Sequence, residues 1–336
     1  MAEGCYDCDD YLEKMGFVPG EHKTIPELVR EGRFVTCLAP MVRYSRLPFR
    51  MLCRKWGCDT AYTPMLMADS FILSRKARDA DLTTNRFDRP LVIQFAAHEP
   101  VTFGIAAKLV AKECDGVDLN CGCPESWVNK QGDGAALLEH PELVADMVKQ
   151  AVNQMEDLAI KTPISIKIRP RRDINQTIEM AQRAEHCGCA YIAMHGRHKS
   201  QGRGGPIDYD AIRTVKDSVK IPVIANGGLN TPETIATMRE KTGVDGVMSG
   251  LGLLNNPSMF LRDEAGTFVS TKTPVQCIHD FVGCSSALGM QFCLVQRHLT
   301  WMTHLMHPSA AKRREFNVSK SLASSIEYIK ENFPLE

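Results

Sequence analysis

One cysteine in this chain stands where a proton donor would be useful. Cys123 belongs to a tight turn, Cys121-Gly122-Cys123-Pro124, which directly follows the apolar run that ends at Asn120. A free thiol has a pKa near 8.5, so at neutral pH it is mostly protonated and can act as a general acid. A thiolate nucleophile would need a nearby base, and the local sequence supplies no histidine. The turn therefore favours Cys123 as an active-site acid over a buried structural cysteine, which is what we expect Cys121 to be.

Residues able to line a ligand site end several other apolar runs. In chain order they are Pro40 and Met41, Gln94, Asn120, Lys167 with Arg169, His195 with Arg197, and Asn226. Lys167 could stabilise the negative charge of a reduced flavin, Gln94 could bond the amide-like edge of the ring, and His195 could donate to the ring or a phosphate. Each also has a structural alternative: a salt bridge, a core amide and a satisfied histidine.

Two glycine-rich segments follow the last two of these runs. They are Gly227-Gly228, before a predicted helix start at Thr231-Pro232, and Gly250-Leu251-Gly252, before a second short helix. Backbone N–H groups beside a helix N-terminus bind anions. In parallel barrels the loops after the last two strands commonly hold phosphate. Together the segments predict a phosphorylated ligand, although each alone could be a tight turn.

Short β-branched runs alternate with amphipathic segments from Phe34 onward. The predicted strands are 34–38, 60–63, 91–95, 116–120, 164–168, 191–194, 223–225 and 246–248. The predicted helices are 48–56, 101–113, 141–155, 174–187, 210–217 and 232–240. This alternation favours an α/β fold of the (β/α)8 TIM-barrel type, with ligands at the carboxyl ends of the strands. A doubly wound open sheet is the alternative topology.

The pattern changes at both ends of this alternating region, which spans residues 33–262. Residues 1–32 are acidic and weakly periodic, and they predict an extension or cap. Residues 263–336 carry helical signals without a convincing strand. They predict a C-terminal α-helical domain of three or four helices, two of which are separated by Pro308.

The amino-acid composition limits which binding partners and cellular compartments we expect. The chain has 40 Lys and Arg against 40 Asp and Glu, so any RNA contact must come from local basic patches. No segment suits a membrane span, an export signal or a presequence, and the odd count of 13 cysteines favours reduced thiols. We expect a cytoplasmic monomer, with the nucleus as the alternative compartment. Cys5 and Cys8 lack a second pair at zinc spacing, so we expect no metal.

The motifs resemble, in identity and order, those of the tRNA-dihydrouridine synthases. The matching segments are Ala39-Pro40-Met41, Asp118-Leu119-Asn120-Cys121-Gly122-Cys123-Pro124, Lys167-Ile168-Arg169, His195-Gly196-Arg197 and Asn226-Gly227-Gly228. The resemblance covers residues 34–260, and the run Gly132-Asp133-Gly134-Ala135 after the cysteine turn makes it quite specific. The lead-in and the helical tail look most like the eukaryotic branch that acts on uridines 20a and 20b of the tRNA D-loop.

This resemblance implies an FMN-dependent oxidoreductase, reduced by NADPH or NADH, that converts uridine in tRNA to 5,6-dihydrouridine. In the family, hydride passes from the flavin to C6 and a cysteine protonates C5, a role that falls on Cys123. The flavin-contacting positions would be Pro40, Met41, Gln94, Lys167 and His195, and the phosphate-binding positions Asn226, Gly228, Gly250 and Leu251.

Three positions depart from the family pattern. Leu251 stands where the family usually has an arginine that grips the FMN phosphate, Gly228 replaces an aspartate, and His198 replaces a threonine. Loss of the arginine removes a charge-assisted hydrogen bond worth about 1.5–3 kcal/mol. We therefore expect FMN to bind more weakly than is usual in the family.

A uridine within folded tRNA must be turned out of its stack to meet a flavin, and this requires phosphate contacts around the pocket. The predicted substrate-binding residues are Asn120, Arg169, Arg197, Arg313 and Arg314. Further candidate cations are Arg171, Arg172, Lys199, Arg203, Arg297, Lys312 and Lys320. Two alternatives stay open: an FMN barrel reductase for a free pyrimidine, and a tRNA-binding protein with weakened or lost flavin chemistry.

Overall fold

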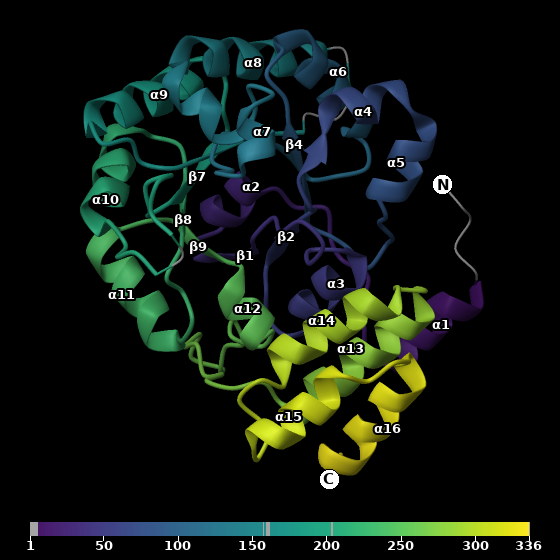
Figure 1. Ribbon diagram of the computed structural model, residues 1–336. Helices are drawn as coiled ribbons and strands as arrows, with labels where there is room; N and C mark the ends of the chain where they lie inside the picture. Colours follow the sequence, from purple (N-terminus) through teal and green to yellow (C-terminus); the bar gives the residue numbers. More distant parts are fainter. Residues whose placement is uncertain (1–5, 157, 159–161, 203, 336) are drawn as a thin grey trace.

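Parallel strands form the centre of the molecule. The structure is a computed structural model that describes residues 6–156, 158, 162–202 and 204–335 (Figure 1). The strands are β1 (Val35–Leu38), β2 (Thr60–Tyr62), β4 (Leu91–Ala96), β5 (Gly116–Asn120), β6 (Ile164–Ile168), β7 (Tyr191–His195), β8 (Val223–Asn226) and β9 (Gly246–Ser249). Pairing of β1 with β9 and of β2 with β4 closes the sheet on itself. The predicted (β/α)8 barrel is confirmed, and the open-sheet alternative is wrong.

Several strand ends differ from the prediction by one residue. β7, β8 and β9 each extend to a polar residue, because His195 pairs with Asn226 and Ser249 pairs with Leu38 in the ladder. A ninth strand, β3 (Leu66–Met67), pairs with the end of β4. It was not predicted, since two residues carry no periodic signal.

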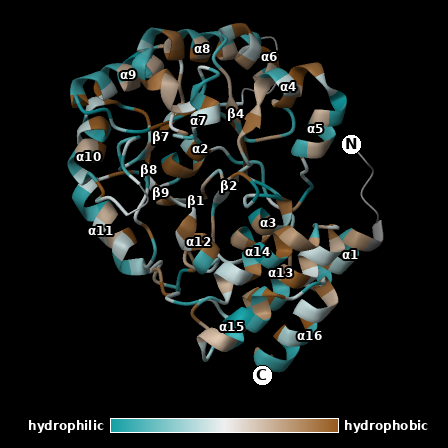
Figure 2. Ribbon diagram, in the orientation of Figure 1, coloured by the Kyte–Doolittle hydropathy of each residue, from teal (hydrophilic) through white to brown (hydrophobic). Residues whose placement is uncertain are grey.

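Helices surround the barrel, and Figure 1 shows them as an arc around the strands. The larger ones are α3 (Leu47–Lys55), α6 (Pro100–Val110), α8 (Pro141–Gln154), α9 (Ile174–His186), α10 (Tyr209–Ser218) and α11 (Pro232–Thr242). Smaller pieces lie in the connections: α4 (Ala68–Leu73), α5 (Arg75–Asp81), α7 (Ser126–Asn129), the 3-10 helix η1 (Gly134–Glu139) and α12 (Leu251–Asn255). Figure 2 shows hydrophobic and hydrophilic residues mixed along the outer helices, as expected for helices with one buried face.

The N-terminal residues form two helices, and the second one closes the barrel at the amino-terminal ends of its strands. These are α1 (Tyr6–Lys14) and α2 (Ile25–Arg30). Thr24 caps α2 and forms a reciprocal capping box with Glu27. Ile25 and Leu28 of α2 are buried in a cluster with side chains from inside the barrel, among them Tyr191. The segment therefore acts as a plug for the amino-terminal end of the barrel interior. Its two helices were not predicted, because the segment is only weakly periodic.

Four helices form the C-terminal region: α13 (Val275–Ala287), α14 (Phe292–Met302), α15 (Ala310–Asn317) and α16 (Leu322–Asn332). As predicted, Pro308 lies between two of them. They pack together at the bottom of Figure 1. The fully buried His298 of α14 bonds through Nε2 to the Tyr44 carbonyl oxygen at 2.9 Å. The tail is thereby fixed to the loop that follows β1.

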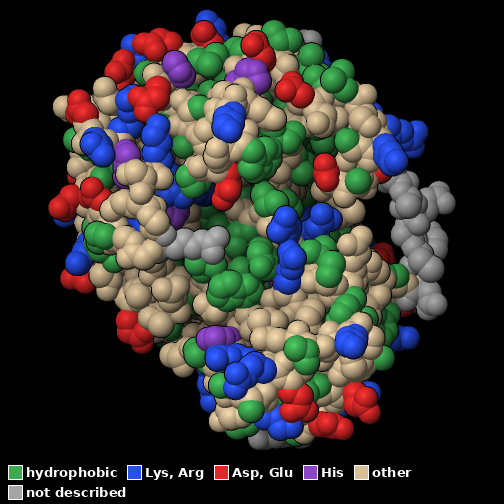
Figure 3. All heavy atoms as spheres, viewed as in Figure 1, with side chains coloured by type: hydrophobic (Ala, Val, Ile, Leu, Met, Phe, Trp, Pro, Cys, Tyr) green, Lys and Arg blue, Asp and Glu red, His purple; other side chains and the backbone are tan. Residues whose placement is uncertain are grey.

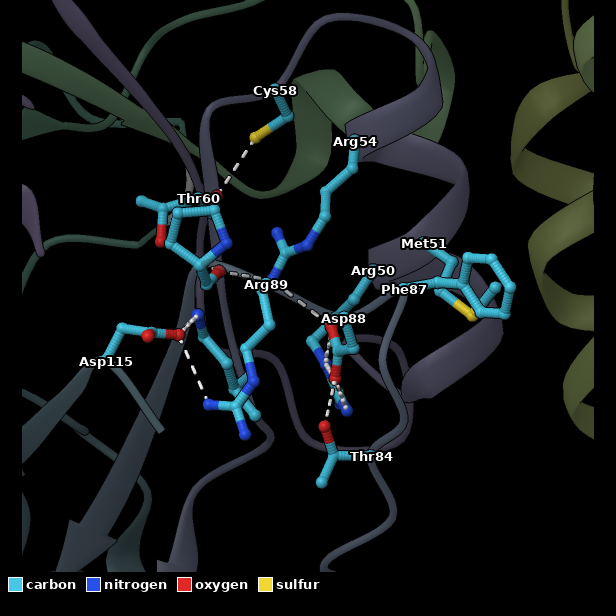
Figure 4. A network of polar contacts seen from close by, with 12 residues as sticks. Arg50, Met51, Arg54, Cys58, Thr60, Thr84, Phe87, Asp88, Arg89 and Asp115 are labelled. Carbon is cyan, nitrogen blue, oxygen red and sulfur yellow. Dashed lines mark hydrogen bonds and ion pairs between the residues drawn. The ribbon is translucent and has the colours of Figure 1, made fainter. Parts of the chain in front are cut away.

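A buried ionic network ties α3 to the segment that leads into β4 (Figure 4). The Arg50 guanidinium donates to Asp88 through both Nε and Nη2, at 3.0 Å and 2.6 Å to Oδ2. Arg54 Nη2 reaches the same carboxylate at 3.2 Å. Arg50 and Asp88 are almost fully buried, so each charge depends on the other for its stability. The network fixes the amino-terminal end of the barrel, away from the strand ends that carry the predicted site.

No helix in the described part of the chain is long and apolar enough to cross a membrane. Within the same residues, no group of three or more His, Cys, Asp and Glu side chains is arranged to hold a metal ion. Cys5, one member of the weak zinc pair, lies outside the described residues.

Candidate active site

The carboxyl ends of the strands open into a cleft with two adjoining chambers. The glycine chamber, of about 430 Å³, is lined by the loops after β8 and β9 together with His195. The cysteine chamber, of about 570 Å³, is lined by Cys123, Gln94 and residues of α14. Both share Pro40, Met41, Pro124, Glu125, Lys167, Arg169 and Leu251 in their walls. Figure 3 shows hydrophobic side chains in a hollow near the centre of this face, with Lys and Arg side chains on its margin.

The Cys123 turn is held from both sides. Its backbone N–H donates to Asn120 Oδ1 at 2.9 Å, and its carbonyl oxygen accepts from the Ala135 N–H at 2.9 Å and from Asn129 Nδ2 at 3.0 Å. Burial raises the pKa of the Cys123 thiol above its ordinary value, with Arg169 and Lys167 opposing the shift. At neutral pH the side chain is therefore a protonated thiol that faces the cleft. Cys121 is fully buried and acts in packing, as expected.

Lys167 projects from the end of β6 into the wall shared by the two chambers. Its ammonium group forms no hydrogen bond or ion pair with any described residue. Burial and then Arg169 lower the pKa of Lys167 to about 8, against the effect of Asp118. The charged form still predominates at pH 7, so a free ammonium group is available to an anionic or polar ligand.

His195 is a neutral hydrogen-bond donor to the glycine chamber. Its Nδ1 accepts the Arg197 N–H at 3.1 Å, which leaves the proton on Nε2. Burial, followed by the charges of Lys167, Arg169 and Arg197, lowers the pKa of His195 to about 2. Nε2 lies beside Gly227, where an added Cβ would be 3.2 Å away. A neutral Nε2–H therefore faces the chamber throughout the physiological pH range.

The two glycine-rich segments have different reasons for glycine. Gly227 and Gly228 have φ values of 109° and 72°, a region that favours glycine. Gly252 is required by packing, because a Cβ there would lie 2.1 Å from the Leu229 carbonyl oxygen. The N–H groups of Gly228 and Gly250 donate to no other described residue. Two unpaired backbone donors therefore border the glycine chamber.

Two of the predicted site residues, Asn226 and Arg169, also form hydrogen bonds to backbone carbonyl oxygens of neighbouring segments. Asn226 Nδ2 donates to the Met248 carbonyl oxygen at 2.7 Å. Arg169 Nε donates to the Gly122 carbonyl oxygen at 2.6 Å and its Nη1 to the Arg197 carbonyl oxygen at 3.1 Å. Arg169 thus links the cysteine turn to the loop after β7, besides lining both chambers.

The other predicted cations are divided between the cleft and the outer surface. Arg197 lines the glycine chamber and Arg297 the cysteine chamber. Arg171 and Lys199 both pair with Glu139. Arg313 and Arg314 lie on α15 and line neither chamber, and Figure 3 shows basic side chains gathered over that helix. Arg203 lies outside the described residues.

Several residues of the cysteine chamber were not predicted. Trp127 on α7 is 50% exposed, and Tyr44 and Trp301 bring the loop after β1 and the tail into the wall. Arg43, on the rim, has a φ of 72°, and no other non-glycine residue in the described part of the chain has a positive φ. The exposed tryptophan next to the cysteine turn was a detectable signal, whereas the contacts with the tail depend on long-range packing.

Residues 37–334 match the family model described as dihydrouridine synthase. The chain belongs to the dihydrouridine synthase family. This synthase is 41% identical over 314 residues to a Homo sapiens protein named tRNA-dihydrouridine(20a/20b) synthase [NAD(P)+]-like, covering 93% of this chain and 96% of the relative. It is 37% identical to the Schizosaccharomyces pombe tRNA-dihydrouridine(20a/20b) synthase [NAD(P)+], covering 91% and 90%. It is 30% identical to the Yersinia pestis tRNA-dihydrouridine synthase B, covering 91% and 99%.

Proposed function

We propose that this synthase reduces uridine in the D-loop of tRNA to 5,6-dihydrouridine, at positions 20a and 20b, with FMN as cofactor and NAD(P)H as reductant. Relatives similar over almost their whole length bear the 20a/20b and NAD(P)+ names. The observation that carries the proposal is the shared cleft wall. Lys167 and Arg169 join the chamber of the Cys123 thiol to the chamber of the glycine loops.

The residues of the cleft fit a flavin mononucleotide. The unpaired N–H groups of Gly228 and Gly250 and the neutral Nε2–H of His195 would hold the phosphate. Pro40 and Met41 would contact the isoalloxazine ring, and Gln94 would bond its polar edge. The Lys167 ammonium would stabilise the negative charge of the reduced ring. Leu251 supplies no charge, so Arg197 is the cation we assign to the phosphate in place of the family arginine.

In the reaction the C5–C6 double bond of uridine gains a hydride at C6 and a proton at C5, while NAD(P)H is oxidised to NAD(P)+. When bound, FMN would supply the hydride. The Cys123 thiol supplies the proton and becomes a thiolate. Lys167 and Arg169 stabilise that thiolate, since both oppose the rise in its pKa. The thiolate then regains a proton from water, which completes the cycle.

The rim of the cysteine chamber suits an extruded nucleotide. Trp127 offers an aromatic face on which a base can stack. Arg43 and Arg297 are exposed cations on the same rim and would bind the flanking phosphates. Asn120 has one side-chain N–H left for the substrate, because Gln94 and the cysteine turn use its other groups. Arg313 and Arg314 would bind tRNA farther from the reacting base.

The direct test is an assay with flavin-loaded protein, NADPH and unmodified tRNA, followed by mapping of dihydrouridine. We expect product at positions 20a and 20b. Product from free uridine at a comparable kcat/KM would favour the free-pyrimidine reductase. Colourless purified protein that binds tRNA but neither retains added FMN nor forms product would favour the tRNA-binding alternative, which Leu251 suggests.

A further inference from the structure

A chain of hydrogen bonds runs along the floor of the cleft from a buried carboxylate to Cys123. Gln94 Nε2 donates to Asp118 Oδ2 at 2.7 Å, and Asn120 Nδ2 donates to Gln94 Oε1 at 2.8 Å. Asn120 Oδ1 then accepts the Cys123 backbone N–H at 2.9 Å. Asp118 and Gln94 are fully buried and Asn120 is 8% exposed, so water competes little for these groups.

The barrel register dictates this arrangement. Gln94 on β4 and Ser165 on β6 are the direct neighbours of Asp118 on β5. Because side chains alternate along a strand, Asn120 faces the same side as Asp118, two residues nearer the mouth. The four side chains therefore meet inside the barrel, and only Asn120 reaches the cysteine turn.

The hydrogen bonds from Asp118 to Cys123 can run in only one direction, from donor to acceptor. A carboxylate only accepts hydrogen bonds, so it selects the amide nitrogen of Gln94 and turns the Gln94 oxygen toward Asn120. A backbone N–H only donates, so Cys123 selects the oxygen of Asn120 and turns its nitrogen toward Gln94. The Asp118 carboxylate and the Cys123 N–H therefore favour the same orientation of the Gln94 and Asn120 amides. This orientation requires a hydrogen-bond acceptor at position 118.

We propose that Asp118 is a positioning residue for the reduction, which sets the place of the Cys123 turn through Gln94 and Asn120. This inference rests on the proposed function, in which Cys123 supplies the proton. Ser165 Oγ donates to Asp118 Oδ1 at 2.6 Å and, with Gln94 and Lys167, offsets part of the cost of a buried charge. Burial raises the pKa of Asp118 to about 6, so the carboxylate predominates at pH 7.

The test compares three variants in single-turnover reactions of pre-reduced enzyme with tRNA. Asp118→Ala removes the acceptor, and misplacement of a reacting group by about 1 Å can reduce the rate about 100-fold. Asp118→Asn keeps an acceptor for Gln94 and a donor for Ser165, so it should retain most of the rate. Ser165→Ala is the matched control: it removes a bond to the same carboxylate but leaves the path to Cys123 intact. If Asp118→Ala does not fold, Asp118→Ser replaces it, since its hydroxyl is too short to reach Gln94.

A merely structural role would make Asp118→Ala and Ser165→Ala lose rate in parallel with thermal stability, and that result would overturn the proposal. So would equal losses in Asp118→Asn and Asp118→Ala, because charge rather than hydrogen bonding would then be responsible. A readout without cofactor is alkylation of Cys123 by iodoacetamide in flavin-free protein. Its rate should change more than about threefold in Asp118→Ala and remain unchanged in Ser165→Ala.

A double-mutant cycle ties the effect to Cys123. In a Cys123→Ala background, Asp118→Ala should cause a much smaller loss than in the unaltered enzyme, since the proton donor it positions is already absent. The loss that remains reports the effect on Gln94 and Asn120, which would contact flavin and substrate. Losses that multiply would show that Asp118 acts elsewhere and would overturn the positioning role. Full activity in Cys123→Ala alone would instead contradict the proposed function, so the two failures are distinguishable.

Discussion

Gly134 packs directly against Cys123. A Cβ on Gly134 would lie 2.9 Å from the Cys123 carbonyl oxygen and 3.1 Å from the Cys123 Cβ, and the residue has a φ of 63°. The segment that begins η1 therefore forms the back of the cysteine turn. A side chain at position 134 would also meet Val128 Cγ1 at 2.9 Å, so it can be accommodated only if the Cys123 turn or its support on α7 shifts.

Gly134→Ala should reduce the rate of dihydrouridine formation roughly 10- to 100-fold, because displacement of the proton donor by less than 1 Å weakens a step that depends on alignment. The matched control is Gly266→Ala, which has a similar φ of 81° but open space around it. Both variants should lose about 1 kcal/mol of stability from backbone strain. Equal activity in the two variants would contradict the role assigned to this contact.

The pH dependence of the reaction should reflect the Cys123 thiol. Burial disfavours the thiolate and raises the pKa of Cys123, so the competent protonated form persists through neutral pH. Activity should therefore fall only on the alkaline side, as pH rises through that raised pKa. Lys167, with a pKa of about 8, titrates on the same side.

Alkylation separates the two groups, because iodoacetamide reacts with the thiolate alone. The rate of Cys123 modification, followed by mass spectrometry, should rise at a higher pH than that of a free thiol in solution. Half-maximal modification at or below neutral pH would identify Cys123 as a thiolate nucleophile and contradict its role as an acid.

Trp127→Ala should weaken tRNA binding about tenfold, since stacking of a base on an aromatic ring is worth ~1–3 kcal/mol. Trp127→Phe should retain most of the affinity. Leu73→Ala is the control, because Leu73 is an apolar side chain on α4, 83% exposed, that lines neither chamber. Equal affinities of Trp127→Ala and Leu73→Ala in a titration would remove Trp127 from the binding surface.

The double variant Arg313→Ala, Arg314→Ala should weaken tRNA binding and lower the slope of log affinity against log salt by about 2, or about one for each phosphate that an arginine no longer binds. Flavin content should not change, because neither arginine lines the cleft. Lys108→Ala with Lys112→Ala, on and after α6, removes the same charge from the opposite end of the molecule in Figure 1. An unaltered slope in the arginine variant would reject a role for Arg313 and Arg314 in tRNA binding.

The barrel could be predicted because most of its strands are short apolar runs with a ligand-type residue at or just after their carboxyl ends. Gln94, Asn120, Lys167 and His195 then had to meet at one mouth, since parallel strands share their carboxyl ends. The helix α2 was detectable as well: Thr24 and Glu27 form a sequence-level capping box. Its function as a plug was not, because Leu28 meets Tyr191 only in the closed fold.

The part of the cysteine chamber wall that α14 forms could not be predicted from the sequence, for a similar reason. Trp301 Nε1 donates to the Tyr44 hydroxyl at 3.3 Å, across a separation that no local pattern encodes. The position of the proton on His195 likewise depends on the loop geometry, because the backbone N–H of Arg197 donates to His195 Nδ1. Residue types predicted which groups gather at the mouth, and the structure was needed for the protonation state of each.

The most direct measurement is single-turnover dihydrouridine formation by Cys123→Ser, loaded with flavin and pre-reduced, on unmodified tRNA. The hydroxyl keeps the shape of the thiol but is a far weaker acid, so the rate should fall at least about 100-fold, the usual contribution of a general acid. Cys121→Ser, altered two residues away at a buried site outside the cleft, should retain flavin and activity. A Cys123→Ser enzyme that forms dihydrouridine at the rate of the unaltered protein would contradict the role of Cys123 as the proton donor.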